Sequence, residues 1–92
     1  MSDVMEKHLL ISGRVQGVGF RYFTRKNAQK IGVTGFVKNL PDGNVETAFR
    51  GTPDQVQQME QLVSDGPAGA RVDNVDELEP TGEQFRNFKV RR

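Results

Sequence analysis

Hydrophobic and polar side chains alternate along residues 7–15, and this alternation predicts a half-buried strand. The residues on one side are Leu9, Ile11, Gly13 and Val15, and those on the other side are His8, Ser12 and Arg14. His8 and Ser12 therefore share the polar side. Ser12 has no neighbouring base in the sequence, so we interpret both as sheet-face residues rather than as catalytic groups.

A helix is predicted to begin at Phe20, because apolar residues recur at helical spacing after the glycine-containing turn of residues 16–19. Its expected buried side holds Phe20, Phe23, Ala28 and Ile31, and its polar side holds Arg25, Lys26, Gln29 and Lys30. Phe20 and Phe23 are thus interpreted as core residues rather than as substrate contacts. Gly32 is expected to end the helix, because glycine readily adopts the left-handed conformation at that position.

Two strands over residues 33–40 and 44–50 are predicted on either side of a hairpin turn at Pro41, Asp42 and Gly43. The turn accounts for Asp42 and Gly43 without a catalytic role. A second helix is predicted after this hairpin. Its capping residues are Thr52, Pro53 and Gln55, its buried residues are Val56, Met59, Leu62 and Val63, and it ends at Gly66 and Pro67.

Residues 70–79 are predicted to form a further strand, although Val72, Val75 and Leu78 are spaced by three and not by two. This spacing predicts a bulge or an irregular edge. Residues 85–90 are expected to add a short final strand. The element order predicts an α+β, two-layer sandwich of the ferredoxin-like kind. Two helices would cover one face of a mainly antiparallel sheet, and the other face would be largely open.

The 92 residues suffice for one domain, which we assign to residues 1–92, with residues 1–6 as a loose N-terminal extension. The sequence has no cysteine and a single histidine, which excludes disulfides, thiolate catalysis and cysteine- or histidine-rich metal sites. It shows neither a targeting peptide nor an apolar stretch of membrane-spanning length. We therefore expect a cytoplasmic monomer without a metal or other cofactor.

Charge is distributed unevenly along the chain. Residues 1–50 hold eight basic and four acidic residues, whereas residues 51–92 hold five basic and eight acidic residues. An anionic ligand would therefore be drawn to the first half. The overall net charge of +1 is too small for a general nucleic-acid-binding surface.

The segment from Gly13 to Arg21 runs from a predicted strand through a glycine-containing loop into a predicted helix. Backbone amides at a helix N-terminus lack intrahelical partners, and glycines let successive amides turn toward one anion. Arg21 lies in the first helical turn, where a guanidinium can contact two oxygens of the same anion. The segment is not a Walker loop, and Tyr22 occupies the place of the third glycine in a dinucleotide-binding motif. These features predict a phosphate- or carboxylate-binding loop.

Two spaced motifs resemble the signatures of the acylphosphatase family. They are Gly13-x-Val15-Gln16-Gly17-Val18-x-Phe20-Arg21, and Gly35-Phe36-Val37-Lys38-Asn39 followed by Asp42-Gly43-Asn44-Val45-Glu46. The resemblance covers the chain from about residue 7 to the C-terminus. It implies hydrolysis of a small-molecule acyl phosphate to a carboxylate and inorganic phosphate. It also implies that Arg21 binds the phosphoryl group and that Asn39 positions water. The resemblance further implies that backbone amides hold the phosphoryl group, namely those of Gln16, Gly17, Val18, Gly19, Phe20 and Arg21.

The expected mechanism needs neither a metal nor a covalent intermediate, because phosphoryl transfer depends mainly on positioning and charge stabilisation. Asn39 carries a carbonyl acceptor and an amide donor, which suffice to orient water. Neither motif offers an Asp, Glu or His as a base. A phosphate oxygen of the substrate is therefore the expected proton acceptor.

Alternatives remain open from the sequence. Gly35-Phe36-Val37 resembles a fragment of an RNA-binding motif, and α+β modules of this element order can bind RNA through aromatic residues on the open sheet face. A non-catalytic relative that binds acyl or carbamoyl phosphate is a second alternative. Lys38 either adds positive charge beside Asn39 or is a solvated strand residue. The favoured interpretation is an enzyme without a nucleic-acid or membrane partner. The sequence does not identify its physiological substrate among acetyl phosphate, carbamoyl phosphate and 1,3-bisphosphoglycerate.

Overall fold

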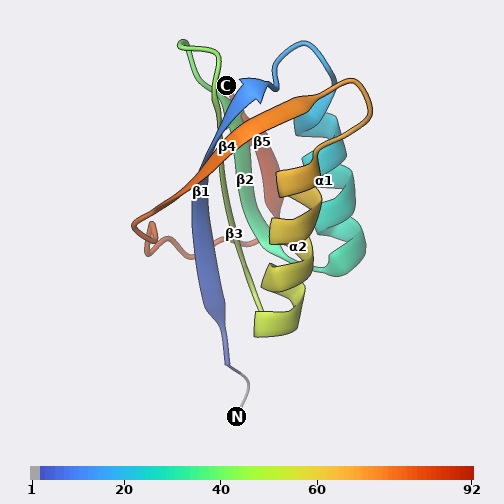
Figure 1. Ribbon diagram of the computed structural model, residues 1–92. Helices are drawn as coiled ribbons and strands as arrows, with labels where there is room; N and C mark the ends of the chain where they lie inside the picture. Colours follow the sequence, from blue (N-terminus) through green and yellow to red (C-terminus); the bar gives the residue numbers. More distant parts are fainter. Residues whose placement is uncertain (1–2) are drawn as a thin grey trace.

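Two helices pack on one face of a five-stranded sheet in the computed structural model, which describes residues 3–92 (Figure 1). The strands are β1 (Met5–Arg14), β2 (Thr34–Asn39), β3 (Val45–Gly51), β4 (Arg71–Leu78) and β5 (Phe88–Arg91), and the helices are α1 (Phe20–Ile31) and α2 (Pro53–Asp65). The strand order is β4-β1-β3-β2-β5. Neighbouring strands are antiparallel except β2 and β5, which are parallel. The predicted α+β sandwich is confirmed.

A single core lies between the helices and the sheet. Its buried side chains are Leu9, Ile11, Val15, Phe20, Ala28, Val33, Val37, Val45, Phe49, Val56, Met59, Val63 and Phe88. Both helices contribute to it, because each presents an apolar stripe to the sheet. Within residues 3–92, no helix has the length and apolar character that crossing a membrane requires.

The first strand begins earlier than the sequence predicts. Met5 and Glu6 pair with Gly51 and Arg50 of β3, so the assignment of residues 1–6 to a loose extension is wrong for these two residues. The local pattern does not reveal this pairing, because the partner strand lies more than forty residues away. Residues 1 and 2 lie outside the described part of the chain.

The buried side of α1 differs from the prediction, because Thr24 joins it and Ile31, like Phe23, is only half-buried. Phe20, Thr24 and Ala28 are buried, whereas Phe23 is half-buried and contacts the edge of the Phe20 ring. Thr24 tolerates burial because its hydroxyl donates a hydrogen bond of 2.8 Å to the Phe20 carbonyl oxygen. Phe20 is therefore a core residue as predicted, and Phe23 lies at the margin of the core.

A bulge in β4 explains its three-residue apolar spacing. Ser12 lies opposite Asn74, but the next residue, Gly13, lies opposite Val72, which leaves Asp73 as the extra residue. Val72 and Val75 consequently both pack against the core. The predicted irregularity of this strand is confirmed.

The last strand is shorter than predicted, because β5 begins at Phe88 and residues 85–87 precede it. It runs alongside β2, with Gly35 opposite Phe88 and Val90 opposite Val37. This parallel pairing is long-range and brings the C-terminal residues next to the end of β2.

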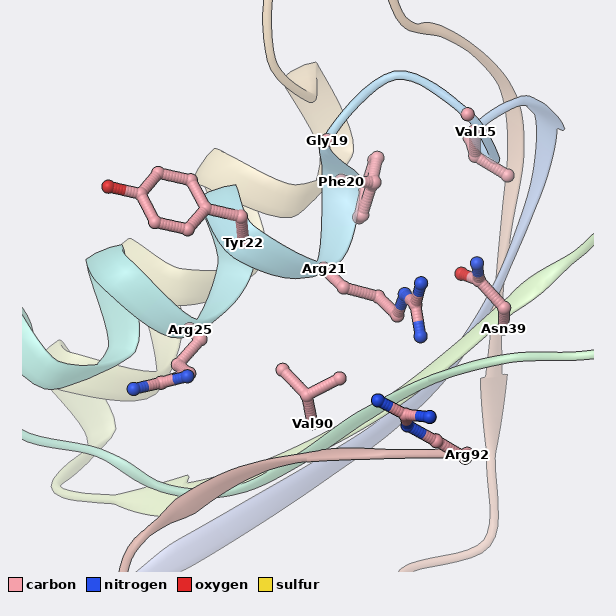
Figure 2. A pocket seen from close by; sticks show the side chains of 10 residues that line it. Val15, Gly19, Phe20, Arg21, Tyr22, Arg25, Asn39, Val90 and Arg92 are labelled. Carbon is pink, nitrogen blue, oxygen red and sulfur yellow. The ribbon is translucent and has the colours of Figure 1, made fainter.

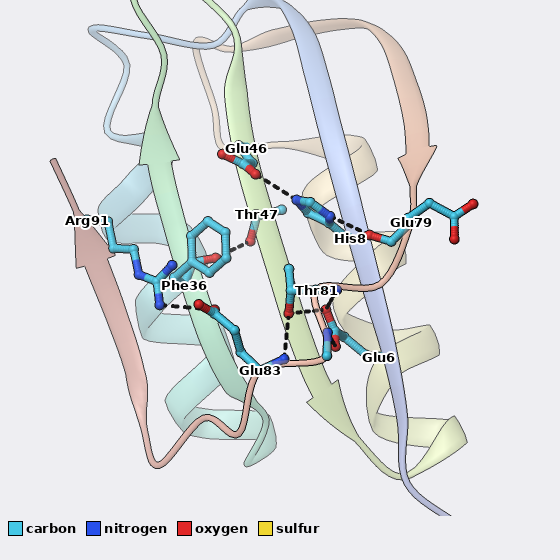
Figure 3. Close-up of polar contacts among 10 residues, drawn as sticks. Glu6, His8, Phe36, Glu46, Thr47, Glu79, Thr81, Glu83 and Arg91 are labelled. Atoms are coloured by element: carbon cyan, nitrogen blue, oxygen red, sulfur yellow. Dashed lines mark hydrogen bonds and ion pairs between the residues drawn. The ribbon is translucent and has the colours of Figure 1, made fainter.

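Residues 79–87 cross the sheet face opposite the helices, so this face is less open than predicted (Figure 3). The Glu6 carboxylate accepts hydrogen bonds of 2.7 Å from both the backbone amide and the hydroxyl of Thr81. Further along the segment, the Phe85 ring packs against Phe36, with ring centroids 6.1 Å apart. Main-chain and side-chain contacts thus tie the segment to the sheet.

The covered sheet face argues against the RNA-binding alternative and shows the surroundings of His8. Phe36 is only 3% exposed, and the guanidinium carbon of Arg91 lies 4.1 Å from its ring centroid. The ring is therefore not available to stack on a base, as the RNA-binding alternative requires. His8 is a sheet-face residue as predicted, and its ring nitrogens lie 2.7 Å from a Glu46 carboxylate oxygen and 2.7 Å from the Glu79 carbonyl oxygen.

Candidate active site

The loop between β1 and α1 borders the cavity at the N-terminus of α1 through Gly17 and Gly19. Gly17 and Gly19 have φ angles of 75° and 77°, and Gly19 is the N-cap. A Cβ at either glycine would meet no atom within 4 Å, so glycine is required by the backbone conformation and not by lack of space. The helix has neither a side-chain cap nor an acidic residue in its first turn. Its positive end and its free amides therefore remain available to an anion.

A cavity of about 490 Å³ opens at this helix end (Figure 2). It is lined by Val15, Gly17, Gly19, Phe20, Arg21, Tyr22, Arg25, Asn39, Val90 and Arg92. The lining thus combines the loop, the first turns of α1, the last residue of β2 and the end of β5. Three stretches of the chain that are far apart in sequence therefore meet to form one site.

Arg21 lies in the first turn of α1, and its guanidinium points into the cavity toward Asn39 (Figure 2). No ion pair within residues 3–92 includes Arg21. A guanidinium without a carboxylate partner, beside a helix N-terminus, favours a bound oxyanion.

Asn39 is the last residue of β2, and its side chain faces Arg21 across the cavity (Figure 2). Its Oδ1 atom is buried and accepts no hydrogen bond from any described residue. A buried acceptor without a donor costs about 1–3 kcal/mol, so a donor from a ligand or from water would stabilise the site. The position and chemistry of Oδ1 match the water-positioning role that the family resemblance implies.

Gln16 contributes more than the backbone amide that the sequence predicts. Its side-chain nitrogen donates hydrogen bonds of 2.8 Å to the Leu40 carbonyl oxygen and 2.9 Å to the Asn44 carbonyl oxygen. These contacts tie the loop to the hairpin that carries Asn39. Sequence reasoning missed this role, because the acceptors lie 24 and 28 residues away and carry no side-chain signal.

The predicted phosphate-binding residues do not all reach the cavity surface. Gly17, Gly19, Phe20 and Arg21 line it, whereas Gln16 and Val18 do not, and Val18 packs against the core. The amide of Val18 remains in the same loop. Lys38 lies on the opposite face of β2 from Asn39 and does not line the cavity, so its contribution to the local charge is indirect.

The structure adds five residues to the lining that the sequence did not assign to the site: Val15, Tyr22, Arg25, Val90 and Arg92. Tyr22 is 70% exposed and points away from Arg21 (Figure 2). Periodicity could have indicated Arg25, which follows Arg21 by four helical residues. Val90 and Arg92 had no local signal, because the pairing of β5 with β2 brings them to the site.

The donors around the cavity suit an anion. Three arginines line it, and none of the described lining residues is acidic. Within residues 3–92, no group of three or more His, Asp or Glu side chains is placed to hold a metal ion. Guanidinium groups and backbone N–H groups are hydrogen-bond donors without acceptor capacity, so they match phosphoryl oxygens and not a cation.

Comparisons with known proteins agree with this geometry. The acylphosphatase family model matches residues 7–90. An acylphosphatase of Roseiflexus sp. is 47% identical over 92 residues, which cover 98% of each chain. The acylphosphatase structure from Coxiella burnetii is 37% identical and has a TM-score of 0.86, covering 97% of this chain and 94% of its own. The acylphosphatase structure from Bacillus subtilis is 33% identical and also has a TM-score of 0.86, covering 98% of this chain and 100% of its own. The chain therefore belongs to the acylphosphatase family.

Proposed function

We propose that this protein hydrolyses acyl phosphates to a carboxylate and inorganic phosphate. The observation that carries the proposal is the placement of Arg21 and the unpartnered Oδ1 of Asn39 on opposite sides of one cavity, at the amide-lined N-terminus of α1. Such a site can hold a phosphoryl group and a water molecule at the same time. Membership of the acylphosphatase family supports the same activity.

The phosphoryl group binds to the Arg21 guanidinium and to backbone amides of residues 16–21, of which Gly17, Gly19, Phe20 and Arg21 line the cavity. Charge on the three equatorial oxygens is then met by fixed donors at a helix N-terminus. Donors held in place before the reaction need no rearrangement as the charge shifts. Arg21 therefore serves both substrate binding and stabilisation of the transition state.

Asn39 Oδ1 accepts a hydrogen bond from the attacking water and orients it toward phosphorus. The water oxygen forms the new P–O bond while the bond to the carboxylate oxygen breaks, so no covalent enzyme intermediate arises. A carboxylate leaves readily without a strong general acid. We assign the proton of the water to a phosphoryl oxygen of the substrate, because no described lining residue is an acid or a histidine.

We further propose that the protein acts as a cytoplasmic monomer on a small-molecule substrate, without a metal, a cofactor, or a nucleic-acid or membrane partner. The absence of cysteine and the donor chemistry of the cavity support this proposal. The burial of Phe36 supports the exclusion of RNA.

The test is turnover of benzoyl phosphate by the purified protein, with p-nitrophenyl phosphate as the counter-substrate. We expect rapid hydrolysis of the first compound only. The Arg21→Ala, Asn39→Ala double variant is the matched negative control for a contaminating phosphatase. Binding of phosphate without turnover of benzoyl phosphate would instead favour the non-catalytic relative.

A further inference from the structure

The cavity holds more positive charge than the proposed reaction uses. Arg21, Arg25 and Arg92 all line it, but the mechanism assigns a role only to Arg21. Within residues 3–92, no ion pair includes Arg25 or Arg92. Elsewhere on the surface, Arg71 pairs with Asp73 at 2.9 Å and Arg91 pairs with Glu83 at 3.2 Å. Arg21, Arg25 and Arg92 thus meet at the cavity without an acidic partner, whereas the other described arginines without an ion pair, Arg14, Arg50 and Arg86, do not line it.

The position of Arg92 follows from the parallel pairing of β5 with β2. Arg91 lies opposite Lys38, so the next residue reaches the level of Asn39 at the end of β2. Its side chain turns back toward the cavity, and its guanidinium points toward Arg21 (Figure 2). Val90 lies between Arg92 and Arg25 in this view and presents an apolar surface that is 37% exposed.

Guanidinium groups that converge without a paired acid repel one another, and solvent weakens this repulsion without removing it, since Arg25 and Arg92 are exposed. A bound anion relieves it. One phosphoryl group is already met by Arg21, by the loop amides and by the helix N-terminus. Arg92 is therefore matched to a second negative charge on the same ligand, beyond the apolar surface of Val90.

We infer that Arg92 is a specificity-determining residue that selects acyl phosphates whose acyl group carries its own anionic group, a carboxylate or a phosphate. This inference rests on the proposed acylphosphatase activity. Val90 contacts the carbon part of the acyl group, and Arg25 adds positive charge from the other side of Val90. Substrates with an uncharged acyl group are hydrolysed by the same machinery but gain nothing from Arg92.

The test compares 4-carboxybenzoyl phosphate with 4-methylbenzoyl phosphate, which differ in the charge at one end of a rigid ring. In Arg92→Gln, we expect kcat/KM for the carboxylated substrate to fall about tenfold, as for the loss of one charge-assisted hydrogen bond. We expect kcat/KM for the methylated substrate to stay within about twofold, since its phosphoryl contacts are unchanged. Intrinsic reactivity cancels, because each comparison uses one substrate in two proteins.

Lys89→Gln is the matched control. It removes the same charge three residues earlier in the chain, but Lys89 lies in β5 opposite Phe36, on the other face of the sheet. We expect this variant to leave both substrates unchanged. A selective loss in Lys89→Gln equal to that in Arg92→Gln would overturn the inference. The preference for the carboxylated substrate would then come from long-range electrostatics and not from a contact with Arg92.

Two further outcomes also overturn the inference. An equal loss on both substrates would assign Arg92 to the phosphoryl group, and no loss on either would leave it without a substrate contact.

Failure of the unaltered protein to hydrolyse either substrate would overturn the proposed function instead. Calorimetric binding of the two β-ketophosphonates, in which CH₂ replaces the bridging oxygen, then still tests the selectivity of Arg92. The inference requires tighter binding of the carboxylated analogue, lost in Arg92→Gln.

Discussion

The side-chain amide of Gln16 donates a hydrogen bond of 2.8 Å to the carbonyl oxygen of Leu40, the residue that follows Asn39. A second bond of 2.9 Å reaches the Asn44 carbonyl oxygen at the other end of the same turn. The loop proposed to hold the phosphoryl group and the strand end proposed to position the water are thereby joined directly. This one side chain therefore ties the two halves of the site together, in addition to the pairing of β1 with β3 and of β3 with β2.

Gln16→Leu removes both donors while keeping a similar volume. We expect kcat on benzoyl phosphate to fall by up to about 10²-fold, because small displacements of positioning groups are costly in phosphoryl transfer. Steady-state kinetics and thermal melts measure the two effects separately. Gln61→Leu, on the exposed side of α2, is the matched control and should leave kcat unchanged. Normal kcat in a folded Gln16→Leu protein would assign the side chain to stability alone.

The contrast between Gln16 and Arg21 shows what sequence can predict about this site. Arg21 and Asn39 were assigned from motif resemblance, and the loop from its glycines and its place before a helix. The Gln16 contacts depend on backbone oxygens of a distant turn, and the place of Arg92 depends on strand pairing. Contacts to backbone atoms across long sequence separations leave no residue-type pattern to recognise.

The proposed mechanism places Arg21 on the phosphoryl group before and during the reaction. Arg21→Ala should therefore raise KM and lower kcat together, and Arg21→Lys should recover little, since an ammonium lacks the planar pair of donors.

Inorganic phosphate should inhibit the unaltered protein competitively, and this inhibition should weaken in Arg21→Ala. Steady-state inhibition kinetics measure it. Purely non-competitive inhibition would place the anion outside the cavity.

Hydrolysis is expected to be independent of metal ions. The described lining offers three guanidinium groups and no carboxylate or imidazole side chain that would hold a metal ion. EDTA should leave the initial rate on benzoyl phosphate essentially unchanged, and Mg²⁺ should restore nothing. A loss of rate that only a divalent cation reverses would contradict the proposed mechanism. Measuring the rate at matched ionic strength controls for screening of the arginines.

His8 and Glu46 form a stabilising pair on the face opposite the site, with His8 Nε2 and a Glu46 carboxylate oxygen 2.7 Å apart (Figure 3). Glu46→Ala should lower the free energy of unfolding by about 1–3 kcal/mol, because a half-buried hydrogen bond to a charged group is lost. Neither residue lines the cavity, so kcat should stay within about twofold of normal.

Urea denaturation of the two single variants and the double variant His8→Ala, Glu46→Ala measures the coupling between these side chains. A coupling near zero would show that the pair adds no stability. A large fall in kcat with unchanged stability would give Glu46, which lies within the second motif, a role in the reaction instead.

The fold was predictable where its signals are local. The second helix is an example, because Thr52 and Gln55 exchange the hydrogen bonds of a capping box, at 2.9 and 3.3 Å, as their spacing predicts. The early start of β1 and the covered sheet face were not predictable in this way. Both depend on pairing between segments far apart in the chain, which hydropathy patterns do not encode.

Asn39 is expected to act on water, which is not part of the substrate. Asn39→Ala should lower kcat about 10²–10³-fold, the usual cost of losing one preorganised polar group. It should change KM little, because the phosphoryl contacts of Arg21 and the loop remain. The substitution removes a buried acceptor that has no described partner, so thermal melts should show an unchanged or slightly raised Tm. A sharp rise in KM with near-normal kcat would make Asn39 a substrate-binding residue. In that case the water would have to be oriented by another group at the end of β2.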